Sequence, residues 1–233
     1  MSQVGGRARQ GFGCWLEPDE LSEFVDSDAS ITADFTGNAP IIPKSGDPMF
    51  DLALAQTLTK ISEIFDVLPG FGFFDDYEGP NAFASPDVRM HKTDGTVLFG
   101  TNLLRKVRSV QEAPEVAVAA VCAHEFGHTL QSKRRLRDQL LAGQPTVKRL
   151  ELHADFMAGV FAGFRKKEKP SYPAAVFAVT QHSFGDVMFG SFQHHGTPDE
   201  RANAIIEGFN TVKLKNLNID QAALAGVNYV FNT

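Results

Sequence analysis

The side chains best suited to chemistry in this chain lie in the pentapeptide His124-Glu125-Phe126-Gly127-His128, which reads H-E-x-x-H. On a helix, positions i and i+4 share one face, so the imidazoles of His124 and His128 point the same way and can hold one zinc ion. The carboxylate of Glu125 can take a proton from a water that the metal activates. Because the pattern also arises by chance, the rest of the chain must supply what a catalytic zinc still needs.

A third ligand is offered by the segment Glu151-Leu152-His153-Ala154-Asp155. Catalytic zinc takes three protein ligands, and Glu151 is predicted to be the third. Asp155 shares its helix face and is predicted to accept a hydrogen bond from a ligating histidine, with His124 as the favoured partner. Such acids usually lie on solvated helix faces, but here apolar residues follow, which favours burial and pairing. His153, roughly 200° around the helix from Glu151, is not expected to be a ligand.

Hydrophobic periodicity, turn residues and capping signals predict the elements that must position these side chains. Helices are expected at residues 49–67, 102–107, 112–137, 146–167, 173–190 and 197–208. A hairpin is expected over residues 80–100, with arms at 81–88 and 96–99 and the turn at Asp94-Gly95. The last helix opens with a capping box at Thr197-Pro198-Asp199-Glu200.

The order of four segments resembles the gluzincin metallopeptidases, most closely the HtpX and CAAX-prenyl-protease branch, and is similar to the bacterial neutral zinc metallopeptidases. H-E-x-x-H is followed by E-x-x-A-D-x-x-A-G at 151–159. The stretches G-P-N-A-F-A at 79–84 and D-G-T-V-L-F-G at 94–100 precede it, and H-G-T-P-D-E-R at 195–201 comes last. The resemblance covers roughly residues 50–208. The chain lacks the transmembrane helices of the membrane-bound members, which suggests a soluble form.

The resemblance implies an α+β fold: a mainly helical, zincin-like (minimal gluzincin) domain with a small β-sheet of about three strands. Its active-site H-E-x-x-H helix is expected to pack against the helix that carries Glu151. The implied cofactor is Zn²⁺ on His124, His128 and Glu151, with Glu125 as the general base.

Two residues near the end of the matching region are candidates for supporting catalysis. His195 is the expected donor to the oxyanion of the transition state, with His194 as the fallback; the alternative is a surface or cap-adjacent histidine. Arg201 is expected to pair with Asp155 or Glu151, or to hold the His195 loop; the alternative is a surface arginine.

The strand segment Asn81, Ala82 and Phe83 is the expected substrate-binding element. An extended peptide could add to its edge by β-augmentation, which would hold the scissile bond over the metal. The alternative is an ordinary buried strand.

Composition bounds the remaining possibilities. An apolar fraction of 43% and a charged fraction of 21% indicate one globular domain at 49–233, preceded by an N-terminal extension at 1–48 of unknown role. The net charge of −6 argues against nucleic acid as a partner. Neither a signal peptide nor an apolar run long enough for an integral membrane anchor is seen, so a cytoplasmic enzyme acting on peptides or proteins is expected.

The two cysteines, Cys14 and Cys122, form no C-x-x-C pair, which favours a reducing compartment. A thiolate from Cys14 could occupy the open metal position and keep the enzyme latent, although free cysteine is more often a small buried hydrophobe. Cys122 is predicted to point away from the metal face into the core.

The leading hypothesis is therefore a zinc-dependent endopeptidase. One alternative is a catalytically silent, zinc-stabilised binding or chaperone-like module, which the presence of Glu125 disfavours. Another is a zinc hydrolase of non-peptide amides or esters, for which the same metal and base would serve equally well.

Overall fold

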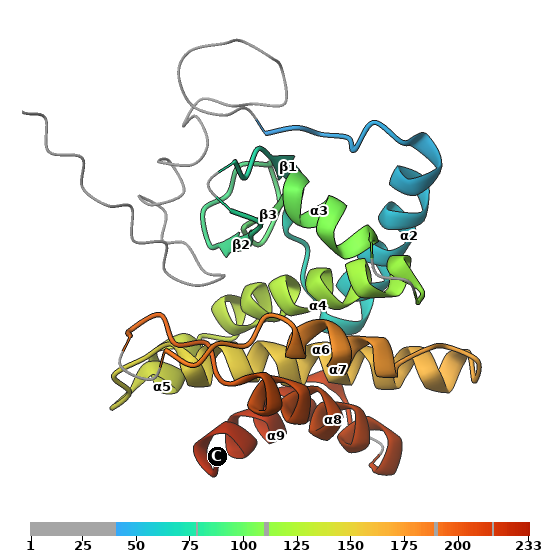
Figure 1. The fold of residues 1–233 in the computed structure, drawn as a ribbon. Helices are drawn as coiled ribbons and strands as arrows, with labels where there is room; N and C mark the ends of the chain where they lie inside the picture. Colours follow the sequence, from blue (N-terminus) through green and yellow to red (C-terminus); the bar gives the residue numbers. More distant parts are fainter. Residues whose placement is uncertain (1–40, 78, 110–111, 189–190, 216) are drawn as a thin grey trace, which may run out of the picture.

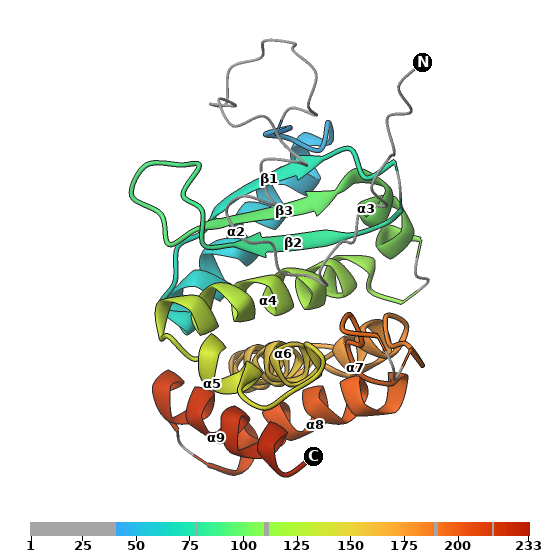
Figure 2. The same cartoon turned by 90° about the vertical axis from the view of Figure 1, so that its left-hand side faces the viewer.

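The computed structural model describes residues 41–77, 79–109, 112–188, 191–215 and 217–233, and these residues form a layered α+β structure (Figure 1). The layers are a small sheet, then α4 (Pro114–Lys133), then α6 (Lys148–Glu168), and finally α8 (Pro198–Leu214) with α9 (Ile219–Phe231) (Figure 2). The expectation of a mainly helical domain with a small sheet is confirmed. In the described part of the chain, no helix combines the length and the apolar character that crossing a bilayer requires.

The sheet has the strand order β1-β3-β2 and is mixed. β2 (Ala82–Ser85) pairs antiparallel with β3 (Thr96–Gly100), as the expected hairpin requires, with Phe83 opposite Leu98. The first strand is shorter than the predicted arm at 81–88, and residues 86–95 form the loop between the two strands. β1 (Gly70–Phe74) pairs parallel with β3 and was not located from the sequence. β2 is the strand next to α4 (Figure 2).

The helices around the sheet follow the apolar periodicity closely. α2 (Pro48–Phe65) begins where Asp47 accepts a hydrogen bond from Phe50 N, and it buries Leu54, Ile61 and Phe65. α3 (Thr101–Arg108) follows β3 directly, and the short α5 (Arg137–Leu141) connects α4 to α6. The capping box of α8 is present as expected, whereas α9, which opens with its own capping box at Asn218, was not anticipated.

α7 (Ala175–His182) is shorter than the helix expected over 173–190. In the loop after it, Asp186 takes part in several hydrogen bonds. Asp186 N donates to Gly196 O, and the Asp186 carboxylate accepts from Met188 N and His195 N. The apolar composition of this segment predicted a helix, but the side chain of Asp186 offers the backbone an alternative set of hydrogen bonds.

Small residues allow the central helices to approach closely. Gly127 of α4 faces Ala154 of α6, where an added Cβ would lie 3.1 Å from Ala154 Cα. This contact between the two helices was expected from the sequence. Gly159, on the same helix as Ala154, faces Ile205 of α8. α6 is therefore buried between two layers, which explains why its acids lie in the interior.

Candidate metal centre and cleft

Three buried side chains converge between α4 and α6. His124 and His128 lie one turn apart on α4, and Glu151 lies in the first turn of α6. The two Nε2 atoms are 3.2 Å apart. Glu151 Oε2 lies 3.3 Å from His124 Nε2, and Glu151 Oε1 lies 3.5 Å from His128 Nε2. The candidate ligand atoms all lie within 4.8 Å of one another, so this cluster could hold a metal ion.

Hydrogen bonds on the far side of each ring orient both histidines. His124 Nδ1 donates to Asp155 Oδ1 at 2.7 Å, and His128 Nδ1 donates to Gln131 Oε1 at 2.9 Å. The amide of Gln131 is itself oriented, because its Nε2 donates to Leu150 O at 2.8 Å. With the ring protons on Nδ1, both Nε2 atoms present lone pairs to the centre of the cluster.

The carboxylate of Glu151 supplies the negative charge of this cluster. Both of its oxygens are buried, and neither has a hydrogen-bond donor in the described part of the chain. Burial alone would raise the pKa of Glu151, but His128 and His124 beside it hold that pKa well below its usual range. When the two imidazoles are neutral, a divalent cation can take over this role, because the buried carboxylate needs a positive partner and both Nε2 atoms then present lone pairs.

The partner of His124 is itself part of a buried ion pair. Arg201 grips Asp155 with two hydrogen bonds, from Nε to Oδ2 at 2.7 Å and from Nη2 to Oδ1 at 3.0 Å. Arg201 Nη2 also donates to Gln181 Oε1 at 3.1 Å. Burial raises the pKa of Asp155, but the charges and hydrogen bonds of Arg201 and His124 together outweigh it and lower that pKa. The predicted Asp155–His124 contact and the predicted pairing of Arg201 with Asp155 are both present.

The partner of His128 belongs to a neutral chain of hydrogen bonds that sequence reasoning missed. Gln131 Nε2 lies 3.1 Å from His153 Nδ1, and His153 Nε2 donates to Ala223 O of α9 at 3.0 Å. Burial lowers the pKa of His153 to about 4, so this ring is neutral and can accept from Gln131. His153 is not among the candidate ligands, as predicted, but it supports one of them. The spacing of Gln131, three residues after His128, was the available signal.

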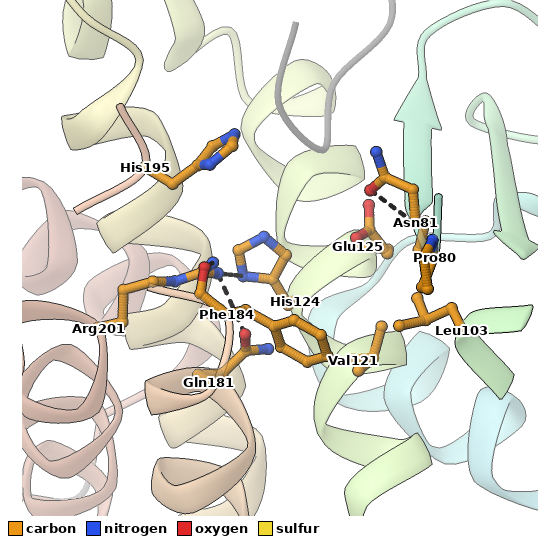
Figure 3. A pocket seen from close by; sticks show the side chains of 11 residues that line it. Pro80, Asn81, Leu103, Val121, His124, Glu125, Gln181, Phe184, His195 and Arg201 are labelled. Carbon is orange, nitrogen blue, oxygen red and sulfur yellow. Dashed lines mark hydrogen bonds between the residues drawn. The ribbon is translucent and has the colours of Figure 1, made fainter. Parts of the chain in front are cut away.

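A cleft of about 240 Å³ opens beside His124. His124 and Glu125 lie at its base, with His195 on one side and Asn81 on the other (Figure 3). Its remaining lining comes from Pro80, Ala82, Leu103, Val121, Gln181, Phe184 and Arg201. Of the predicted substrate-binding residues, Asn81 and Ala82 therefore border the cleft. The side chain of Phe83 packs instead with Phe74 and Leu98 in a separate cluster.

The loop after α7 separates the roles of the two adjacent histidines. His194 Nδ1 lies 2.6 Å from Asp186 Oδ1, which anchors this buried ring to the loop. His195 N donates to Asp186 Oδ2 at 2.9 Å, and the ring Nδ1 of His195 lies 3.4 Å from the same oxygen. His195 lines the cleft, and its buried Nε2 has no hydrogen-bond partner among the described residues. Asp186, which sequence reasoning missed, therefore holds His195 at the cleft.

Only one of the two cysteines lies in the described part of the chain. Cys122 is fully buried on α4, and burial raises the pKa of its thiol, so it belongs to the core as predicted. Cys14 lies outside the described residues, and so does most of the extension at 1–48.

The arrangement can hold a cation, place the Glu125 carboxylate beside it, and present His195 from across the cleft. Glu125 is buried at the base of this cleft, next to His124 on the same helix. The chain matches no protein-family model, no curated protein and no solved structure. Its chemistry must therefore be inferred from its own residues.

Proposed function

We propose that this chain is a zinc-dependent endopeptidase with a gluzincin-type centre, resembling the HtpX and CAAX-prenyl-protease branch. The observation that carries the proposal is the convergence of two oriented imidazole Nε2 atoms and one buried, ionised carboxylate, with Glu125 next to them at the base of a cleft. Nitrogen and oxygen ligands of this kind suit zinc, and three protein ligands are typical of a catalytic site.

Each group at the centre can have a separate role in peptide hydrolysis. Zinc, when bound, polarises a carbonyl and lowers the pKa of a water. Glu125 takes the proton of the attacking water and passes it to the leaving amine. His195, held by Asp186, donates from a protonated Nε2 to the oxyanion that develops on the carbonyl oxygen.

The wall opposite His195 provides a surface for an extended peptide. Asn81 and Ala82 border the cleft at the start of β2, and β2 lies next to α4 (Figures 2 and 3). Main-chain hydrogen bonds along this segment would orient the scissile bond, with Phe83 anchoring the strand from its other face. A peptide is favoured over a small amide because the bordering segment is a strand.

The decisive experiment combines metal analysis with digestion of a peptide library by the wild type and by Glu125→Gln. Both proteins should bind one zinc ion per chain, because Glu125 is not a ligand. Only the wild type should cleave peptides; the substitution should lower kcat by about 10²–10⁴-fold, and a chelator should abolish the wild-type activity. Glu115→Gln, an exposed change at the start of the same helix, serves as the matched control and should cleave normally.

The other outcomes separate the competing functions. Zinc binding without cleavage of any peptide would contradict the proposal and favour a binding module. Hydrolysis of small esters or amides but not of peptides would identify a different zinc hydrolase. Wild-type turnover in Glu125→Gln would refute the role of Glu125.

A further inference from the structure

A buried acid outside the metal centre organises one wall of the cleft. Asp76 follows β1, is only 4% exposed, and was not singled out by its sequence context. Its carboxylate accepts three backbone hydrogen bonds, from Asn102 N at 2.6 Å, Leu103 N at 2.9 Å and Asn81 N at 3.1 Å. One side chain therefore joins the connection before β2 to the first turn of α3.

Further contacts connect the segment before β2 to the start of α3. The residue preceding α3 is Gly100, which has no side chain to cap the helix, and Asp76 supplies the missing acceptors from a distance. Gly100 N donates to Asn81 O at 2.9 Å, and Asn102 Nδ2 donates to Asp76 O at 3.1 Å. A Cβ at position 100 would collide with the Asp76 carboxylate, so the backbones can approach only because this residue is glycine. The start of β2 and the start of α3 thus form one hydrogen-bonded unit.

Both elements joined by Asp76 face the cleft. Asn81 and Leu103 line it on the side opposite His195 (Figure 3). Asp76 itself is not among the residues that line the cleft or form the metal cluster. Its influence on the site must therefore pass through the placement of Asn81 and Leu103.

We propose, on the basis of the proposed function, that Asp76 is a positioning residue for substrate: it sets the place and orientation of the wall against which the peptide backbone lies. Contacts along this wall form equally in the bound substrate and in the transition state, so their loss raises KM and leaves kcat nearly unchanged. The zinc content does not depend on Asp76.

The test compares Asp76→Asn with Asp51→Asn, in which a carboxylate that accepts Ser45 N at the start of α2 is changed in the same way. Asp76→Asn keeps the size of the side chain but turns an amide towards backbone donors. It should raise KM on a cleaved library peptide by about tenfold at unchanged kcat and zinc content. Asp51→Asn should leave KM unchanged. An unchanged KM in Asp76→Asn, or a loss of kcat together with zinc, would overturn the proposal.

Two further variants keep the test decisive if Asp76→Asn folds poorly. Asn102→Ala removes only the side-chain bond to Asp76 O and should shift KM in the same direction by a smaller factor. In a protein that already carries Asn81→Ala, adding Asp76→Asn should raise KM by a smaller factor than it does in the wild type. Both substitutions act through the same wall of the cleft, so their effects are not independent. A fully additive double variant, or no shift of KM in Asn102→Ala, would count against the proposal.

A binding measurement separates this inference from the proposed function. Calorimetry on the zinc-loaded protein compares acetohydroxamate, which reaches only the metal, with a dipeptide hydroxamate that also extends along the wall. Asp76→Asn should weaken only the dipeptide probe, by about tenfold. Equal losses for both probes, or no loss for either, would overturn the role of Asp76. Failure of the wild type to cleave peptides would contradict the proposed function instead, whatever the two probes show.

Discussion

His124 and His128 occupy successive turns of α4 and are equally buried, yet they are held in different ways. His124 donates to a carboxylate that a buried arginine neutralises, through Asp155 and Arg201. His128 donates to an amide that belongs to an uncharged chain running from Gln131 to α9. The first support joins α4, α6 and α8 through charge, and the second joins α4, α6 and α9 through neutral hydrogen bonds alone.

The difference shows which support is more vulnerable. Removing one member of a buried ion pair leaves an uncompensated charge, whereas removing a neutral partner leaves only an unsatisfied donor or acceptor. The carboxylate also strengthens its histidine as a ligand more than an amide does. We therefore expect the metal site to depend more on Asp155 than on Gln131.

The largest effect on stability and zinc affinity is expected from Asp155→Asn, which gives His124 an amide partner like the one that His128 has. Arg201 is only 2% exposed and would lose its anion, so the free energy of unfolding should fall by about 3–5 kcal/mol. Zinc affinity should fall by about 10–100-fold. Urea unfolding of the metal-free protein and competition with a zinc chelator measure the two quantities.

A double variant separates the two consequences of this change. Adding Arg201→Met removes the unpaired charge, so stability should recover while zinc affinity stays low. If the affinity recovered together with the stability, the charge of Asp155 would have no part in orienting His124.

A smaller effect is expected from Gln131→Leu, which removes the neutral support at similar volume. His128 Nδ1 and Leu150 O would each lose a partner, so the free energy of unfolding should fall by about 1–3 kcal/mol. Zinc affinity should fall by about tenfold. The same titrations apply, and a larger loss here than in Asp155→Asn would reverse the ranking of the two supports.

The smallest effect on the metal is expected from His153→Leu, at the far end of the neutral chain. Gln131 keeps its bond to Leu150 O, so zinc affinity should change by less than about tenfold. Ala223 O loses its donor, so amide exchange in α9 should become faster than in the wild type. Unchanged exchange in α9 would show that this helix does not depend on His153.

Local patterns predicted most of the elements and the cluster of candidate ligands. Helix periodicity placed His124 with His128 and Glu151 with Asp155, because residues four apart share a face in any helix. The same reasoning failed where a side chain far along the chain, or a loop, satisfied the backbone. The helix over 173–190 was overextended because the hydrogen bonds of Asp186 were not visible in composition. β1, which begins at Gly70, was missed because Pro69 and Gly70 predict only the end of the preceding helix.

The sequence by itself therefore determined which side chains could bind a metal and which carboxylate could serve as base, since both follow from spacing along one helix. Only the tertiary structure decided what holds them: Gln131 and His153 behind His128, Asp186 behind His195, and Asp76 behind Asn81. His153 lies on a different helix from His128 and reaches Gln131 only because α4, α6 and α9 pack together. Asp186 and Asp76 lie in the same connections as His195 and Asn81, and those contacts depend on the folded course of each loop, which no local period encodes.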